Sequence, residues 1–171
     1  TSGIVEPMSE KALVDTIRLE LDSLYAQGQR IAFLCPGNYG ADFARDTLGL
    51  DLERAVKCSN FIGEAFDHAA YRGYPEILLV GHAGKLVKMA AGVMNTHSSV
   101  ADARQEIFTA HAALCGAPRE TLEGLMAAIS VDACVELLDE VNLRQPVLSR
   151  IGREMETRIA LRMKGQARVE F

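Results

Sequence analysis

The sequence predicts an α/β fold, a three-layer, Rossmann-like domain with a short, mainly parallel sheet and a helical C-terminal half. Three short apolar runs, at residues 31–35, 55–58 and 77–80, have the length and composition of buried strands. Stretches with helical periodicity separate these runs, and that alternation favours a parallel sheet with helical crossovers. Because parallel strands end at the same edge of a sheet, the loops that follow the three strands are expected to lie together.

The first half of the chain carries the strands and the helices between them. Helices are expected where apolar residues recur at helical spacing: over Ser9–Gln27, over residues 41–48 and after Asn60, which is expected to act as a cap. Gly28 and Pro75 are natural stops for the first and third of these helices. In the second helix, Phe43 and Leu48 are expected to face inward.

The second half of the chain is expected to be helical. Ser99 and Asp102 resemble a capping box, which predicts that a helix starts there. Three further helices are expected to begin at Pro118, Ser130 and Val147. The residues expected to face inward on the first two of these four helices are Ala103, Ile107, Ala110, Leu114, Leu122, Leu125, Met126 and Ile129.

Both ends of the sequence look interrupted. Residues 166–171 resemble the start of a strand, the first residues resemble the exit from an element, and the chain has no initiator methionine. We therefore expect residues 1–171 to form a single α/β domain that is part of a longer protein. A chain of 171 residues is long enough to bury a core of its own.

Composition and charge argue against several classes of protein. The 18 basic and 23 acidic residues give a net charge of −5, whereas nucleic-acid-binding domains usually carry a basic excess. No apolar run approaches the roughly 18 residues of a membrane-spanning helix, and no secretory signal is recognisable. The cysteines lack Cys-x-x-Cys spacing, so reduced thiols in the cytoplasm are expected at Cys35, Cys58, Cys115 and Cys134.

The turn Gly81-His82-Ala83-Gly84-Lys85 follows the clearest strand of the chain. A nucleotide-binding P-loop needs four residues between its first glycine and the Gly-Lys pair, followed by Ser or Thr. Here the spacing is two and Leu86 follows, so hydrolysis of ATP or GTP is disfavoured. Two interpretations stay open. Either backbone N–H groups and Lys85 bind an anion, or the segment is a tight turn with a solvated lysine.

The segment Gly37-Asn38-Tyr39-Gly40 lies where a dinucleotide-binding fold places its glycine-rich fingerprint. That fingerprint is absent, and Pro36 removes one backbone donor. Two glycines around Asn and Tyr could still cradle an adenosine or a carboxylate. A plain strand-to-helix turn is the interpretation that residue chemistry alone favours.

The four histidines divide into two pairs. His68 and His111 lie on predicted helices near core positions, with Glu64 as the expected partner of His68. His82 and His97 lie at turns, where an imidazole can donate to a ligand or carry a proton. No two histidines are three or four residues apart, so no helical metal site is indicated.

Four blocks of sequence, taken together, resemble the CbiD family of cobalt-precorrin-5B C1-methyltransferases. They cover essentially the whole chain in order. The blocks are Thr1–Val5 with Pro7-Met8-Ser9, Pro36–Gly40, Ser59-Asn60-Phe61, and Val80–Lys88 continuing through Asn95–Ser98 to Val100–Arg104.

The resemblance implies transfer of a methyl group from S-adenosylmethionine to C1 of cobalt-precorrin-5B, a tetrapyrrole of anaerobic cobalamin biosynthesis. It also implies an N-terminal domain of the same protein as a partner, and it allows a homo-oligomer. The residues expected at the methyl donor are Gly37, Asn38, Tyr39, Gly40, Ser59, Asn60 and Phe61. Those expected at the tetrapyrrole are Gly81, His82, Gly84, Lys85, Asn95, Thr96 and His97. The alternative is a non-catalytic α/β module for ligand binding or assembly.

Overall fold

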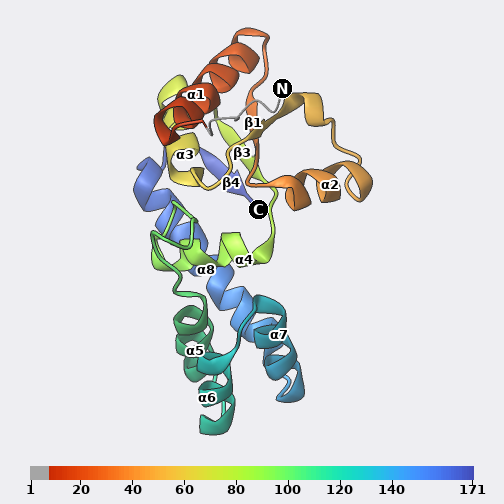
Figure 1. The fold of residues 1–171 in the computed structure, drawn as a ribbon, viewed down its shortest axis with the longest axis vertical. Helices are drawn as coiled ribbons and strands as arrows, with labels where there is room; N and C mark the ends of the chain where they lie inside the picture. The colour runs from red at the N-terminus through yellow and green to blue at the C-terminus, as the bar shows by residue number, and fades with distance from the viewer. Residues whose placement is uncertain (1–7) are drawn as a thin grey trace, which may run out of the picture.

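A four-stranded parallel sheet lies towards one end of an elongated molecule, and a helical arm forms the other end (Figure 1). The computed structural model describes residues 8–171, so the expected features at Thr1–Pro7 lie outside the described residues. The strand order is β2-β1-β3-β4, and the strands are β1 (Ile31–Cys35), β2 (Ala55–Lys57), β3 (Glu76–Leu79) and β4 (Arg168–Glu170). All three predicted strands are confirmed, and the predicted C-terminal strand is the fourth.

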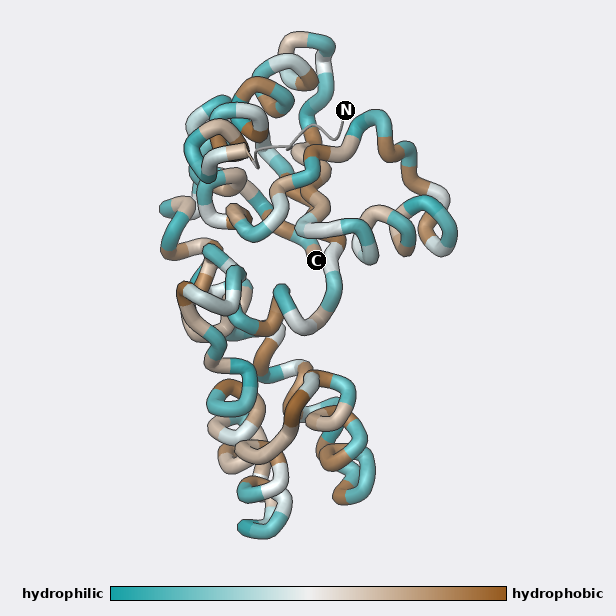
Figure 2. Tube along the Cα trace, in the orientation of Figure 1, coloured by the Kyte–Doolittle hydropathy of each residue, from teal (hydrophilic) through white to brown (hydrophobic). Residues whose placement is uncertain are grey.

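Helices cover both faces of the sheet, but unequally. The main core contains residues of β1 and β3 together with helices α1 (Glu10–Ala26), α3 (Ile62–Arg72) and α8 (Arg144–Met163). On the opposite face, α2 (Asn38–Asp46) packs its small residues Ala41 and Ala44 against Phe33 and Cys35 of β1. The expected α/β layering with a short parallel sheet is therefore confirmed. In Figure 2 the central strand β1 is largely hydrophobic, whereas the helices alternate between hydrophobic and hydrophilic segments.

The C-terminal half is helical, as expected. After β3 come α4 (Ala83–Leu86) and the 3-10 helix η2 (Val87–Ala91); the arm contains α5 (Arg104–Leu114), α6 (Arg119–Ala127) and α7 (Val131–Glu140). Helix α8 runs from the arm back to the sheet (Figure 1) and buries every fourth residue from Val147 to Met163. This row of side chains joins the two parts of the molecule, because α8 contacts η2, α5 and β4. No helix within residues 8–171 is long and apolar enough to cross a bilayer.

Several residues expected to face inward are exposed, and these predictions are wrong. Phe43 on α2 and Leu48, which lies beyond the end of α2, are exposed because the helix approaches the sheet through Ala41 and Ala44. Phe108 and Ala112 form the buried face of α5 with Ile107. The other misplaced residues are Ala110 and Leu114 on α5, Met126 on α6 and Ile129 just after α6, all of them exposed.

Two local predictions are also corrected. Helix α5 begins at Arg104 rather than at Ser99, because Ala103 adopts a left-handed conformation with φ of +89° immediately before it. His68 does not pair with Glu64: its Nε2 lies 2.9 Å from Oδ1 of Asp22 on α1. The carboxylate of Glu64 instead accepts a hydrogen bond from Arg18 of α1.

Candidate functional site

The loops after β1, β2 and β3 meet around one ammonium group. Lys85, in the turn after β3, donates from Nζ to Oδ1 of Asn60, which follows β2, over 2.9 Å. The same Nζ lies under the turn after β1, since a Cβ added at Gly37 would be 3.6 Å from it. The expectation that these loops share one edge of the sheet is therefore confirmed.

A cleft of about 590 Å³ opens at this meeting point, and we call it the cationic cleft. Its walls come from α2, the turn after β2, α4, η2, the 96–98 loop and the first turns of α5 and α7. Seven of the residues predicted at the site line it: Tyr39, Asn60, His82, Gly84, Lys85, Thr96 and His97. Residues expected at the methyl donor and residues expected at the tetrapyrrole thus face the same space.

Three basic side chains give the cleft a positive charge. Lys85 is half-buried, and Lys88 and Arg104 line the same cleft. Burial lowers the pKa of the Lys85 ammonium, and the positive charge of Lys88 acts in the same direction. Asp102 is held by Arg104, which donates to it from Nε over 2.6 Å and from Nη2 over 2.5 Å. These hydrogen bonds lower the pKa of the Asp102 carboxyl, so it stays charged and partly offsets the cations.

Lys88 is almost completely buried, with 3% of its surface exposed. Its Nζ donates to the carbonyl oxygens of Thr96, over 3.3 Å, and Ala101, over 2.9 Å. The carboxylate of Asp102 lies 3.9 Å from the same nitrogen. Lys88 therefore ties η2 to both ends of the loop that carries His97 and leads into Arg104.

A short antiparallel bridge between Phe61 and Asn95 forms a wall of the cleft. Neighbouring residues of extended chains point to opposite sides. Asn60 and Thr96 accordingly face the cationic cleft and hydrogen bond to each other through their side chains. Phe61 and Asn95 face a second pocket on the other side of the wall. Two of the residues predicted at the site therefore do not line the cationic cleft.

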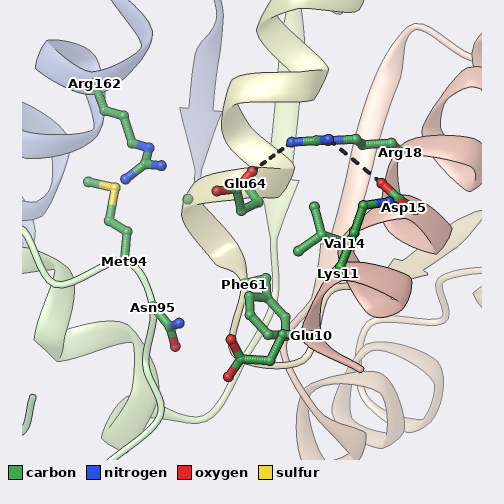
Figure 3. A pocket seen from close by; sticks show the side chains of 11 residues that line it. Glu10, Lys11, Val14, Asp15, Arg18, Phe61, Glu64, Met94, Asn95 and Arg162 are labelled. Carbon is green, nitrogen blue, oxygen red and sulfur yellow. Dashed lines mark hydrogen bonds and ion pairs between the residues drawn. The ribbon is translucent and has the colours of Figure 1, made fainter. Parts of the chain in front are cut away.

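Figure 3 shows this second pocket, of about 410 Å³, between α1, α3 and the segment around Met94 and Asn95. Its charged side chains are largely paired within the protein. Arg18 lies 3.0 Å from Glu64 and 3.8 Å from Asp15, and Arg162 lies 2.8 Å from Asp67. The pocket therefore lacks the concentration of one charge that the cationic cleft has.

The remaining predicted site residues shape the backbone instead of lining the cleft. Gly40 packs against the end of β3 and Gly81 against Pro36. Ser59 has a φ of +50°, which turns the chain sharply between β2 and Asn60. Asn38 is the exposed first residue of α2, a helix that begins three residues earlier than expected.

The two histidines of the cleft are held through Nδ1. His82 accepts a hydrogen bond from the N–H of Gly84 over 3.1 Å. His97 accepts one from the N–H of Ser99 over 3.2 Å. In the neutral ring Nε2 then carries the proton, so each histidine offers a ligand one N–H donor.

Sequence reasoning missed six residues of the cleft: Lys88, Ser98, Arg104, Ser130, Val131 and Asp132. Lys88 could have been found, because it lies three residues after Lys85 and so on the same helical face. Ser130 to Asp132 belong to the start of α7, far along the chain, and no local pattern marks them.

The described residues contain no group of three His, Cys, Asp or Glu side chains that could hold a metal ion. The four cysteines are free thiols, as expected, and Cys115 is only half-buried. Burial raises the pKa of Cys35 to about 11 and that of Cys58 to about 12, so both remain protonated. They are structural residues of the core.

Comparison with known proteins gives the chain its family. Residues 95–171 match the model of the C-terminal domain of CbiD. The chain is 48% identical over 170 residues to a protein of Ruminiclostridium cellulolyticum, covering 99% of the chain and 44% of the relative. It is 40% identical over 166 residues to a protein of Methanosphaera stadtmanae, covering 96% and 44%. Both relatives are named cobalt-precorrin-5B C(1)-methyltransferase.

A third relative with that name, from Desulfitobacterium hafniense, is 45% identical over 136 residues, covering 80% of the chain and 35% of the relative. The chain therefore spans less than half the length of the curated relatives it matches. No solved structure shows significant similarity to it. From the family match and the identity along nearly its whole length, the chain belongs to the CbiD family.

Proposed function

We propose that this chain is part of a methyltransferase that moves a methyl group from S-adenosylmethionine to C1 of cobalt-precorrin-5B during cobalamin biosynthesis. The names of its relatives support a methyltransferase of this pathway. The observation that carries the proposal further is the shared cleft. Tyr39 and Asn60, from the loops assigned to the methyl donor, line it together with Lys85 and His97, from the segments assigned to the tetrapyrrole.

Methyl transfer needs this kind of arrangement. A nucleophilic ring carbon attacks the sulfonium methyl in line, a C–C bond forms, and the sulfur leaves as a neutral thioether. The two reacting atoms must be brought to about 3–3.5 Å, so most of the catalysis lies in positioning and in charge complementarity. A single cleft that contacts both ligands provides that positioning, and the step requires no nucleophile from the protein.

The cations of the cleft suit the carboxylates of the substrate. Lys85 and Arg104 present donors at the cleft, with Lys88 buried behind them. A charge-assisted hydrogen bond in such a partly desolvated place contributes about 1.5–3 kcal/mol. The cations are gathered locally on a chain whose net charge is −5, which favours selective binding of a polyanion at this cleft. The free thiols support a reducing compartment such as the cytoplasm.

An anaerobic assay of the full-length protein tests the proposed function. Incubation with S-adenosylmethionine and cobalt-precorrin-5B is expected to give a product one methyl group heavier, together with S-adenosylhomocysteine, both detected by mass spectrometry. Calorimetry under the same conditions should show binding of the methyl donor. A well-folded full-length protein that neither binds the donor nor forms the product would support a non-catalytic module instead.

Lys85→Met is expected to weaken binding of the tetrapyrrole about tenfold to a hundredfold, as for the loss of one charge-assisted contact. It should not destabilise the protein, because Oδ1 of Asn60 keeps the hydrogen bond from Thr96. Titration of the full-length protein with the substrate, and urea unfolding of both proteins, measure the two effects. A loss of stability with unchanged affinity would assign Lys85 a structural role.

The stability difference between wild type and Lys85→Met should depend on pH. The pKa of Lys85 is lowered in the folded protein from its ordinary value of about 10.5, mainly by burial. Between the two pKa values the unfolded chain binds more protons, so the free energy of unfolding of the wild type rises with pH there. The variant lacks this rise. The stability of Lys85→Met relative to the wild type should therefore fall as the pH approaches 10.5, as measured by urea unfolding of both proteins across that range.

A further inference from the structure

An apolar groove of about 420 Å³ lies beside the cationic cleft, between α4, α7 and α8. Phe108, Ile151 and Met155 are buried residues that contribute to it. The half-buried residues Val135 and Leu148 present side chains to it from α7 and α8. We call this space the apolar groove.

The apolar groove and the cationic cleft lie next to each other. Val131 and Asp132, at the start of α7, line both of them. Across from α7, one short helical segment supplies the other wall of each space. Its residues Ala83, Leu86 and Val87 line the groove, whereas Gly84, Lys85 and Lys88 line the cleft. The segment is therefore a ridge with an apolar side and a cationic side.

The charges at the groove are few. Asp132 lies at its junction with the cleft, and Arg144 is held by Asp139 over 3.2 Å. A ligand that fills both spaces must therefore have an apolar body and anionic groups at one border. A ligand without an apolar surface would gain nothing from the groove, and one without anionic groups would leave the cations of the cleft uncompensated.

We propose that the apolar groove receives a face of the tetrapyrrole ring while carboxylate side chains of the same molecule reach Lys85 and Arg104 in the cationic cleft. The inference rests on the proposed function, because that function supplies a substrate with this chemistry. A tetrapyrrole has a broad, apolar macrocycle with carboxylates around its rim. Val135 and Leu148, which present their side chains to the groove, offer the macrocycle an apolar surface, and the buried Phe108 and Met155 pack behind them.

The arrangement also predicts where in the molecule the methyl transfer takes place. The ring in the groove and the methyl donor in the cleft would meet at Val131, Asp132 and the turn over residues 81–84, which line the border of the two spaces.

Val135→Trp in the full-length protein tests the groove, because an indole there takes up the space that the ring would occupy. Binding of a polycarboxylated porphyrin, uroporphyrin, is followed by fluorescence, and binding of S-adenosylmethionine by calorimetry. We expect porphyrin affinity to fall about tenfold or more, with donor affinity and melting temperature unchanged. Met126→Trp is the matched control, since Met126 is exposed on α6 and lines neither space, and it should change nothing.

The outcomes distinguish a failure of the groove proposal from a failure of the proposed function. If Lys85→Met weakens porphyrin binding and Val135→Trp does not, the ring lies elsewhere. The proposal that the groove receives the ring is then wrong, although the methyltransferase proposal stands. If the wild type binds neither porphyrin nor donor, the proposed function itself fails. Should Val135→Trp not fold, Val135→Thr keeps the volume and adds a hydroxyl to the groove. It should lower porphyrin affinity a few-fold, and unchanged affinity would count against the proposal.

Discussion

Replacing Gly40 by alanine is expected to destabilise the protein by about 3 kcal/mol or more. A Cβ at this position would lie 2.3 Å from the carbonyl oxygen of Val80 and 2.8 Å from Cα of Gly81. Overpacking of side chains alone costs about 1–3 kcal/mol, and here the colliding atoms belong to the backbone at the end of β3. They can move away only if α2 and β3 separate, and urea unfolding measures the cost.

The same substitution should impair ligand binding, because Gly40 holds α2 against the carboxyl edge of the sheet and so places Tyr39 in the cationic cleft. Gly152→Ala is the control for the stability measurement alone, because Gly152 lines the apolar groove. Gly152 lies inside α8 and no atom approaches within 4 Å of its added Cβ, so alanine should raise stability by about 0.5–1 kcal/mol. Similar, small effects of both substitutions would show that α2 packs against β3 less closely than described.

The sheet was predictable because its information is local. Each strand is a short apolar run between turn residues, and the helix between β2 and β3 has an unbroken apolar face. The parallel pairing then follows from the alternation of strands and helices. The position of the site follows in turn, because it depends only on which loops leave the carboxyl edge.

The inward faces of the peripheral helices were not predictable in the same way. Periodicity shows which residues could face a core, but not which neighbour arrives to cover them. Helix α6 lies near the end of the arm, where it contacts mainly α5 and α7, so Met126 and Ile129 remain exposed although they fit the apolar pattern. His68 is a similar case, since its partner Asp22 comes from a helix far away in sequence.

One of the three cations of the cleft was predictable from the sequence, and two were not. Lys85 was predicted from its place in the turn after β3. Lys88 and Arg104 were missed because their roles depend on tertiary contacts, namely carbonyl oxygens of the 96–101 segment for Lys88 and the Asp102 carboxylate for Arg104. A lysine on a short helix is usually solvated, and only the folded loop shows that this one is buried.

Lys88→Met is expected to destabilise the protein by about 3 kcal/mol. The ammonium group donates to the carbonyl oxygens of Thr96 and Ala101 inside the protein, where water cannot easily replace it. Hydrogen bonds from a charged group contribute about 1.5–3 kcal/mol each, and the recovered cost of desolvating the ammonium offsets part of that loss. Methionine matches the lysine side chain as far as Cε and lacks only the ammonium group, so the change removes the donors and leaves the apolar packing nearly intact.

The substitution Lys88→Met should also disturb the cationic cleft, because Lys88 fixes the loop that carries His97 and leads to Arg104. Tetrapyrrole affinity of the full-length Lys88→Met protein is therefore expected to fall even under conditions where it remains folded. Lys11→Met is the matched control: Lys11 is a surface lysine on α1 with an ion pair to Asp15, and its loss should cost no more than about 0.5 kcal/mol. If both lysines behave alike in urea unfolding, the buried ammonium is not what holds the loop, and the hydrogen bonds of Asn60 and Thr96 must do so instead.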